Sequence, residues 1–268
     1  MNHDEATRHA LSFGGVADAY DRARPSYPRE AAIWLTGAPP LRVLELGAGT
    51  GKLTEQLAAL GHVTAAIDPL PEMLAHLARR LPQVGAVLAT AERIPVRSRS
   101  VDVVVSGQAF HWFDPALALP EIARVLRPGG RIALTWNLRD ERIPWVRRLG
   151  ELIGTQDHHS DPRAALADSA LFDVVETEAF RHWQRLDRDG LRDLVASRSN
   201  IAVLDDVGRE RVLRRVEALY DEYGRGADGM LLPYLTHCFR ATVRPDPPGR
   251  RDDPPHNDDS DSLLIDFN

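Results

Sequence analysis

Short apolar runs alternate with helix-forming segments along the first half of the chain. Runs rich in Val, Ile, Leu and Ala are typical of strands that are covered on both faces. The predicted strands are 41–46, 63–67, 84–89, 100–106 and 131–137, and the predicted helices are 30–35, 52–60, 71–80 and 115–126. This alternation predicts an α/β fold with a doubly wound, mostly parallel sheet.

The second half of the chain departs from this regular repeat. We expect a loop at 157–162, helices at 141–152, 191–197 and 210–223, and two further strands at 172–183 and 231–240. The last strand is expected to run antiparallel beside the strand near Val175, which completes a seven-stranded sheet. The later helices form a small helical insertion, a cap at about 184–228.

The predicted organisation has three parts: an N-terminal arm or lid at 1–40, a main domain at 41–243, and a tail at 244–268. Pro, Asp and Gly dominate from Arg244 onward, and such a segment buries too little apolar surface to order itself. We therefore predict a disordered acidic tail. Its last apolar residues are a segment that could dock on a partner or on the protein's own surface.

Composition narrows the class of protein. The chain has 268 residues with 43% hydrophobic content, enough for a full core, and its formal net charge of -6 gives no general attraction to nucleic acid. Its single cysteine, Cys238, excludes an intrachain disulfide and a cysteine-clustered metal site. No apolar run approaches the roughly 20 residues that span a membrane, and the first residues are unlike a signal peptide. We expect a cytoplasmic protein, monomeric or homodimeric, that acts on a small molecule.

A glycine-rich loop follows the first predicted strand. Glycines stand at 47, 49 and 51, where a tight turn before a helix lets a ligand approach bare backbone. A phosphate-binding P-loop would need Gly at 46 and Ser or Thr at 53, and both positions are Leu. The dinucleotide fingerprint would need its third glycine at 52, where the chain has Lys52. The P-loop is therefore rejected, and the case for a dinucleotide-binding loop is weakened.

The remaining pattern, Glu45-x-Gly47-x-Gly49-x-Gly51, resembles the first motif of class I S-adenosylmethionine (SAM) methyltransferases. The resemblance implies a Rossmann-like fold and SAM as the cofactor. In that family the loop wraps the methionine portion and the ribose. Cofactor contacts are therefore expected at Glu45, which would favour the ammonium group, and along the loop at Gly47, Ala48, Gly49, Thr50 and Gly51.

Asp68 closes the second predicted strand at the interval from the loop where a carboxylate accepts hydrogen bonds from a ribose diol. Asp68 before Pro69 is equally typical of a turn or of a helix cap, but its position behind the glycine loop favours the ligand role. Met73, one helical turn further on, is expected either against the adenine or in the core.

The segment after the third strand, Thr90-Ala91-Glu92-Arg93-Ile94-Pro95, resembles the methyltransferase segment Asp-Ala-x-x-Leu-Pro. In the family the acid binds the adenine amino group and the alanine amide meets a ring nitrogen. Here Thr90 occupies the acidic position, so a threonine hydroxyl or Glu92 would take its place. A polar loop that merely leaves the strand is the alternative.

Polar and aromatic residues crowd the end of the fourth strand, in Gly107-Gln-Ala-Phe-His-Trp-Phe-Asp114. Open α/β sheets bind ligands at this edge. Gln108 is expected to touch the cofactor, and His111 and Trp112 to face the acceptor. His111 is either a structural residue or a general base, and Trp112 either a packing wall or an aromatic face near the sulfonium.

Two stretches resemble a narrower subgroup, the trans-aconitate methyltransferase-like enzymes of small molecules. One is Gln-Ala-Phe-His-Trp-Phe-Asp, and the other is the N-terminal pattern Phe…Ala-x-x-Tyr20…Arg24-Pro-x-Tyr27-Pro. The likeness implies that Tyr20, Arg24 and Tyr27 fold back over the active site. The alternative is an arm packed over the sheet.

The sequence therefore predicts SAM-dependent methyl transfer to a carboxylate, phenol, amine or carbon acid. A nicotinamide-dependent oxidoreductase and a non-catalytic SAM-binding module remain as alternatives. No metal is expected, because the adjacent pair His158 and His159 has no accompanying ligand cluster.

Overall fold

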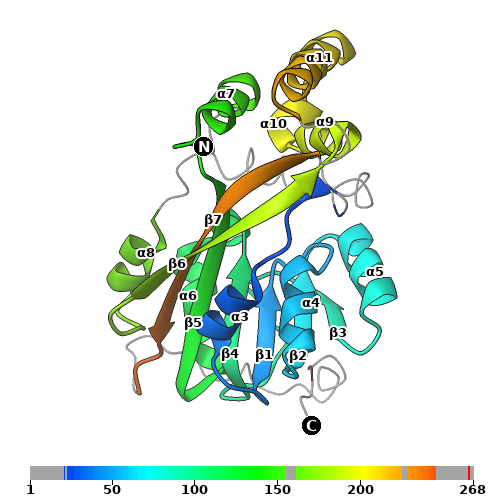
Figure 1. The fold of residues 1–268 in the computed structure, drawn as a ribbon. Coiled ribbons are helices and arrows are strands. Elements are labelled where there is room, and N and C mark those ends of the chain that lie inside the picture. Colours follow the sequence, from blue (N-terminus) through cyan, green and yellow to red (C-terminus); the bar gives the residue numbers. More distant parts are fainter. Residues whose placement is uncertain (1–20, 22, 155–160, 225–228, 246–264, 266–268) are drawn as a thin grey trace. The chain divides into compact units, whose positions relative to one another are not determined.

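A computed structural model describes residues 21, 23–154, 161–224, 229–245 and 265 of the chain (Figure 1). They fall into two compact units. The sheet unit comprises Tyr27–Trp136, Ser160–Phe180 and His237–Asn268. The helical unit comprises Met1–Ser26, Asn137–His159 and Arg181–Thr236.

A seven-stranded sheet has the strand order β3-β2-β1-β4-β5-β7-β6. Its strands are β1 (Arg42–Leu46), β2 (Val63–Asp68), β3 (Gly85–Leu88), β4 (Val101–Gly107), β5 (Leu126–Arg139), β6 (Glu176–Leu186) and β7 (Met230–Thr242). The pairs from β3 to β5 are all parallel, and β7 runs antiparallel (Figure 1). The predicted fold class is confirmed.

The central strands are buried because they are almost wholly apolar. In β4, Val101 and Val103–Val105 are at most 1% exposed, as expected for a strand covered on both faces. The pairing of β1 with β2 places Leu46 opposite Ile67. The glycine loop and Asp68 therefore leave the same edge of the sheet, side by side.

The helices of the sheet unit are α3 (Arg29–Thr36), α4 (Lys52–Ala59), α5 (Pro71–Arg80), α6 (Pro115–Val125), α8 (Pro162–Asp168) and the short 3-10 helix η2 (Phe110–Trp112). A proline at the first position begins α5 and α6, as expected for the N1 position, where no N–H is needed. The Asp114 carboxylate accepts a hydrogen bond from Ala116 N at 2.9 Å and caps α6.

The structure corrects several predicted boundaries. Residues 127–130, which lie between the predicted helix at 115–126 and the predicted strand at 131–137, are part of β5, whose pairing with β4 shifts between Val101 and Val103. Gly129, at φ +80°, provides the backbone conformation for this irregular stretch. The strand expected from 172 begins at Glu176, and helix α8 was not predicted.

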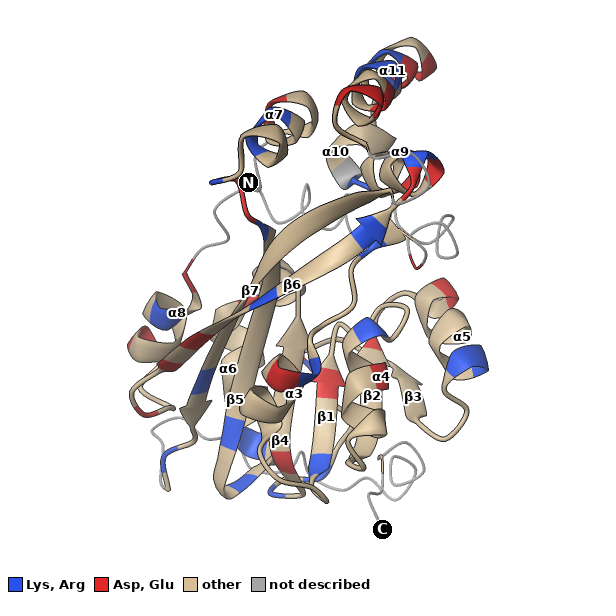
Figure 2. Cartoon of the chain, in the orientation of Figure 1, with Lys and Arg blue, Asp and Glu red and all other residues tan. Residues whose placement is uncertain are grey.

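The helical unit contains α7 (Pro144–Ile153), α9 (Arg188–Ala196), α10 (Ser199–Ala202) and α11 (Asp206–Tyr223). Asp187 and Asp205 cap α9 and α11 by accepting backbone hydrogen bonds from Gly190 and Gly208. Acidic and basic residues are interspersed along α9 and α11 (Figure 2), and Arg188 of α9 pairs with Asp221 of α11 at 3.0 Å.

Most of the predicted tail lies outside the described residues. Ile265 is described: its N–H donates to Pro95 O at 2.9 Å, and it forms an isolated parallel bridge with Val96. Ile265 thus contacts the protein itself, which is one of the two docking alternatives for the terminal apolar residues, and the disordered tail stays a prediction. Among the described helices, none has the length and apolar character that a membrane crossing requires.

A buried ion pair fixes the loop between β3 and β4 onto α6. Arg124 and Glu121 pair at 2.9 Å with side chains 3% and 10% exposed. Arg124 also donates to the carbonyls of Ile94 and Val96, both at 2.8 Å, and Glu121 accepts Ile94 N at 3.0 Å. The pair therefore satisfies backbone groups that the buried loop cannot pair within itself.

We predict that Arg124→Met lowers the free energy of unfolding by about 3 to 5 kcal/mol, because it leaves a buried carboxylate and two carbonyls without their donor. The control is Arg163→Met, which removes the exposed ion pair of Arg163 with Asp161 and should cost at most about 1 kcal/mol. Urea unfolding of the full chain measures both. Equal losses for the two variants would contradict the prediction.

Candidate functional site

The glycine loop has a backbone that other residues adopt only with strain. Gly47, Gly49 and Gly51 have φ values of +68°, +55° and +89°. The N–H groups of Gly47 and Ala48 both donate to Ile67 O, at 2.8 and 3.1 Å. The loop that follows β1 is therefore bonded to the end of β2, as the sequence pattern predicts for this edge of the sheet.

Each glycine of the loop meets different surroundings. A Cβ at Gly47 would lie 2.4 Å from the Cβ of Ala109, and one at Gly51 would lie 3.0 Å from Leu77. A Cβ at Gly49 would meet no described atom within 4 Å. Gly47 and Gly51 are thus required by packing, whereas Gly49 borders open space, where a ligand can approach the backbone.

Asp68 links the glycine loop to the loop after β2. Its carboxylate accepts hydrogen bonds from Gly49 N at 2.8 Å and Leu70 N at 2.9 Å, and the residue is 5% exposed. Burial raises the pKa of Asp68, and the hydrogen bonds from Leu70 and Gly49 act against this rise. Each carboxylate oxygen has a second lone pair, so both can still accept a ligand hydroxyl.

Glu45, near the end of β1, is a second buried acid. It is 2% exposed and accepts a hydrogen bond from Thr54 Oγ1 at 2.6 Å. Burial raises the pKa of Glu45 from 4.5 to about 8; the Thr54 hydrogen bond opposes the rise, and the negative charge of Asp68 adds to it. A bound cation would reverse this effect by favouring the carboxylate.

The predicted adenine segment forms a short turn in which Thr90 and Arg93 form a bridge. Thr90 is exposed and Ala91 is 4% exposed. The Glu92 carboxylate accepts a hydrogen bond from Asp114 N at 3.0 Å, at the N-terminus of α6. Glu92 therefore links this turn to α6. Met73, proposed as an adenine neighbour or a core residue, is 3% exposed.

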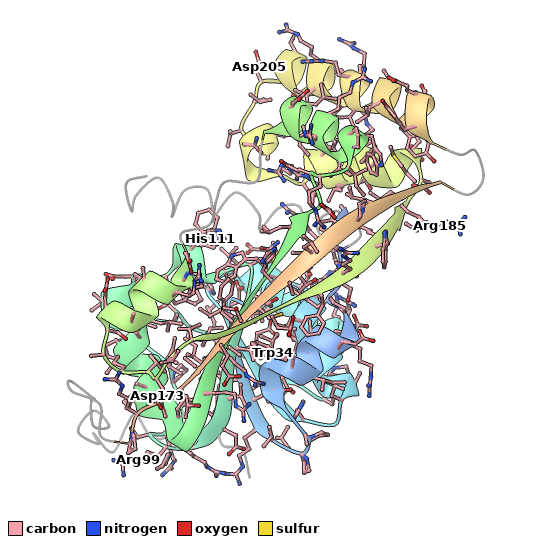
Figure 3. All side chains as sticks on the ribbon, turned by 60° about the vertical axis from the view of Figure 1, so that its left-hand side comes forward. Trp34, Arg99, His111, Asp173, Arg185 and Asp205 are labelled. Carbon is pink, nitrogen blue, oxygen red and sulfur yellow. The ribbon has the colours of Figure 1, made fainter. Side chains whose placement is uncertain are left out.

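The segment after β4 packs against the glycine loop. Gln108 has φ +58°, and its N–H donates to Thr135 O at 2.9 Å. Ala109, next in the chain, faces Gly47. His111 and Trp112 lie on η2, half-buried, with ring centroids 4.6 Å apart; His111 is labelled in Figure 3. The structure thus brings the predicted cofactor loop and the predicted acceptor segment together.

The three residues predicted for the lid differ in their location. Tyr27 is 8% exposed in the sheet unit, and a Cβ at Gly107 would lie 2.6 Å from its hydroxyl oxygen. Tyr20 lies outside the described residues. Arg24 belongs to the helical unit, where its guanidinium donates to Ser197 O at 3.3 Å.

Sequence reasoning missed residues that shape the site through contacts. Thr54 donates a hydrogen bond to Glu45, and Asp114 N donates one to Glu92. Ala109 and Phe113 lie against Gly47. The only signal for Thr54 was its place among apolar residues on the inner face of α4. The others depend on how two loops meet, which no local pattern encodes.

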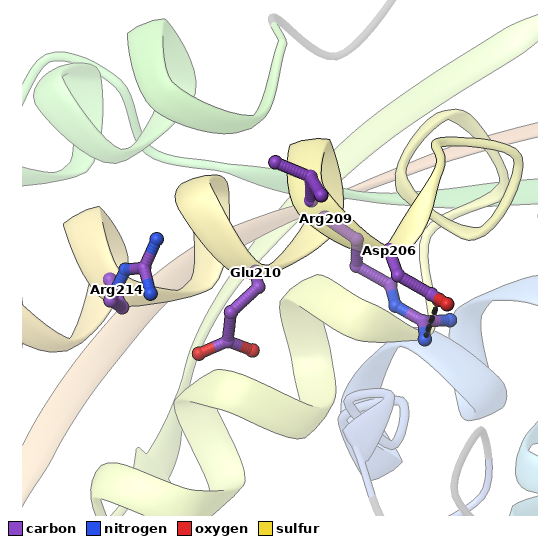
Figure 4. A pocket seen from close by; sticks show the side chains of 5 residues that line it. Asp206, Arg209, Glu210 and Arg214 are labelled. Atoms are coloured by element: carbon purple, nitrogen blue, oxygen red, sulfur yellow. Dashed lines mark hydrogen bonds and ion pairs between the residues drawn. The ribbon is translucent and has the colours of Figure 1, made fainter.

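A pocket also lies outside the glycine-loop region. Figure 4 shows a pocket along α11, lined by Asp206, Val207, Arg209, Glu210 and Arg214. Arg209 pairs there with Asp206 at 3.0 Å, and the pocket contains none of the predicted residues. Within the described ranges no group of three or more His, Cys, Asp or Glu side chains is placed to hold a metal; His158 and His159 lie outside those ranges.

Comparisons with known proteins show the family to which the chain belongs. A family model described as a methyltransferase domain matches residues 44–134. The chain is 48% identical over 236 residues to an uncharacterized methyltransferase of Mycobacterium tuberculosis, which covers 87% of this chain and 96% of the relative. The chain belongs to the class I SAM-dependent methyltransferases.

Further relatives agree with this membership. An uncharacterized methyltransferase-like protein of Schizosaccharomyces pombe is 34% identical over 242 residues, covering 86% of this methyltransferase and 94% of the relative. A malonyl-[acyl-carrier protein] O-methyltransferase of Methylococcus capsulatus is 36% identical, but over only 50% of this chain and 54% of its own. The relatives that match over most of their length therefore establish the family of this chain, but their names specify no methyl acceptor.

Solved structures share the fold of this methyltransferase. A candidate type II methyltransferase from Anaeromyxobacter dehalogenans has a TM-score of 0.61 at 24% identity and covers 84% of this chain and 99% of its own. Phosphoethanolamine N-methyltransferase 2 of Haemonchus contortus, in complex with S-adenosylhomocysteine, has a TM-score of 0.53 at 17% identity and covers 92% of this chain and 61% of its own. At these identities the likeness shows the fold alone.

We predict that Gly47→Ala destabilises this methyltransferase by about 2 to 5 kcal/mol, the sum of a left-handed backbone and a steric overlap. Gly61→Ala is the matched control, because Gly61 has φ +86° and open space around it, so it should cost only about 1 to 2 kcal/mol. Chemical unfolding measures both variants. A smaller loss for Gly47→Ala than for Gly61→Ala would refute the packing argument.

The raised pKa of Glu45 predicts that the free energy of unfolding depends on pH. Its pKa is 4.5 unfolded and about 8 folded, so its contribution is fully present below pH 4.5 and is lost as the pH rises to about 8. As the pH rises through this window, the free energy of unfolding of the wild type should therefore fall relative to that of Glu45→Gln. The fall should be at most about 1.4 kcal/mol per pH unit. Urea unfolding at several pH values measures the difference. A constant difference would contradict the assigned pKa.

Proposed function

We propose that this methyltransferase binds SAM along the glycine loop of the sheet unit and transfers its methyl group to a small-molecule acceptor by in-line displacement. The observation that supports the proposal most strongly is the arrangement around Gly49. Its backbone borders open space, its N–H is bonded to Asp68, and the buried acid Glu45 lies near the end of the strand that leads into the loop.

The residues present fit the parts of this cofactor. Glu45 would pair with the ammonium group, because a cation restores the charge that burial removes from this acid. Asp68 would accept hydrogen bonds from the ribose through its remaining lone pairs. The other proposed cofactor contacts are Gly47, Ala48, Gly49, Thr50 and Gly51 on the glycine loop, Pro69 and Met73 after β2, Thr90, Ala91 and Glu92 on the adenine turn, and Gln108 after β4.

The cofactor supplies a methyl group on a positively charged sulfur. The chain's own contribution is then mainly to position the acceptor in line at roughly 3 to 3.5 Å and to keep water away. A rigid loop serves this purpose, and the hydrogen bonds of Gly47, Ala48 and Gly49 to the end of β2 provide the rigidity.

The acceptor side is proposed from His111 and Trp112 in the sheet unit and from Tyr20, Arg24 and Tyr27 in the N-terminal arm. The motif Gln-Ala-Phe-His-Trp-Phe-Asp supports the narrower proposal that this methyltransferase is trans-aconitate-like. A carboxylate acceptor needs no base, whereas a phenol, amine or carbon acid would give His111 a role as a base.

We predict that Gly49→Ala weakens binding of S-adenosylhomocysteine about tenfold or more, because the new methyl group enters the space beside the backbone. Gly61→Ala again serves as the control, since it introduces the same backbone strain outside the loop, and it should bind as wild type does. Calorimetric titration measures both, with NAD as the competing ligand. Preference for NAD, or equal affinity of the two variants, would refute the proposed cofactor site.

Catalysis is tested separately with SAM carrying a labelled methyl group and a panel of carboxylic acids, phenols and amines. Label should pass to at least one class of acceptor at a rate above the protein-free reaction. Cofactor binding without transfer to any member would count against a small-molecule acceptor of these classes.

A further inference from the structure

The N-terminus of α6 is completed by a residue from another loop of the sheet unit. Asp114 is the N-cap: its carboxylate accepts a hydrogen bond from Ala116 N at 2.9 Å, and its carbonyl accepts one from Ala118 N at 2.8 Å. The N–H of Asp114 itself donates to Glu92 Oε1 at 3.0 Å. Glu92 thus binds a backbone group that lies before the first turn and has no partner in the ladder of the helix.

Many helices satisfy this N–H with a residue of their own. In a capping box, a Glu or Gln three residues after the N-cap reaches back to the N-cap N–H. In α6 that position is Leu117, an apolar residue that is 42% exposed. Glu92, 22 residues before Asp114 in the chain, takes the role of the missing Glu. The start of α6 therefore depends on the loop that follows β3.

The same hydrogen bond fixes one end of the segment that carries His111 and Trp112. This segment, from Gln108 to Asp114, is here called the acceptor segment. At its first end, Gln108 N donates to a carbonyl of β5 at 2.9 Å, and at its second end Asp114 N donates to Glu92. Between the two ends, Trp112 N closes the turn of η2 by donating to the carbonyl of Ala109 at 2.8 Å. The placement of both rings therefore depends on Glu92.

The loop that carries Glu92 is attached to α6 at a second point. Ile94 N donates to Glu121 at 3.0 Å, and Ile94 O accepts a hydrogen bond from Arg124 at 2.8 Å. Glu121 and Arg124 lie on α6, one to three turns after Asp114. Two attachments to one helix hold the loop against α6, so a displacement of the adenine turn is passed to the helix N-terminus.

We propose that Glu92 is a positioning residue that couples the cofactor to the acceptor: it completes α6 from the adenine turn, so that an occupied cofactor site holds His111 and Trp112 in place. The proposal rests on the proposed function, which assigns the adenine to this turn. Oε1 of Glu92 is committed to α6, which favours the Thr90 hydroxyl for the adenine amino group. The contact of Glu92 with the cofactor then becomes indirect. By linkage, the cofactor stabilises the acceptor segment as much as that segment strengthens cofactor binding.

Hydrogen exchange of the full chain measures this link at the amides from Phe110 to Ala118. Without ligand, Glu92→Ala should exchange there about 2-fold to 10-fold faster than wild type, the effect expected for one lost hydrogen bond. Glu92→Asp, which keeps the charge but is one methylene shorter, should do the same. Glu92→Gln should recover most of the protection, because its side-chain carbonyl can accept the same hydrogen bond.

Asp161→Ala is the matched control. The Asp161 carboxylate accepts a hydrogen bond from Arg163 N at 3.0 Å at the start of α8. The variant therefore removes the same kind of bond, from a backbone N–H to a carboxylate, at a helix start outside the proposed site. It should leave exchange between Phe110 and Ala118 as it is in wild type.

The second comparison adds S-adenosylhomocysteine at a concentration that saturates each variant. The ligand should slow exchange of the acceptor segment in wild type and in Glu92→Gln, but not in Glu92→Ala. The double variant Glu92→Ala with Leu117→Glu builds the capping box within α6. It should regain the protection seen without ligand and still lack the response to S-adenosylhomocysteine. A residue that only stabilised the helix would allow both to return.

Each outcome decides one part of the proposal. Exchange as in wild type for both Glu92→Ala and Glu92→Asp would overturn the positioning role. A wild-type segment that does not respond to bound S-adenosylhomocysteine, or an equal response in Glu92→Ala, would overturn the coupling. Failure of S-adenosylhomocysteine to bind wild type would count against the proposed function instead, and the comparison without ligand would still decide whether Glu92 positions the segment.

Discussion

The two backbone hydrogen bonds to the Asp68 carboxylate join the loops on which the candidate site depends. The carboxylate is buried, so its charge must be balanced by donors, and Gly49 N and Leu70 N provide them from two different loops. The parallel register of β1 with β2 brings these loops to one edge of the sheet. The glycines then become necessary because Gly47 lies against Ala109 and only a glycine backbone reaches the bonded position without strain.

A buried acid at this edge of the sheet destabilises the fold. Glu45 is a buried acid near the end of the strand that leads into the loop, and its raised pKa means that folding favours its neutral form. Natural proteins retain such destabilising groups at functional sites, where a ligand compensates for them. Glu45 and Asp68 together form a locally acidic end of the sheet, which suits a cofactor that carries an ammonium group and a sulfonium.

The helical unit carries its charges differently from the sheet edge. Its exposed helices carry paired charges such as Arg188 with Asp221, whereas Tyr234 lies in its buried apolar core. The exposed pairs lie in water and contribute little to stability.

The sequence by itself determined the fold class and most of the elements. The periodic segment Pro71–Arg80 has a proline at its first position and forms α5 with the predicted bounds, and the glycine spacing located the loop and Asp68. Only the tertiary structure decided the strand order, the irregular start of β5, the hydrogen bond from Asp114 N to Glu92, and the link from Tyr234 through Gln184 to Ala23. Strand, turn and cap signals act over a few neighbouring residues and can be read locally. Contacts between segments far apart in the chain depend on packing, so they are fixed only when the whole chain has folded.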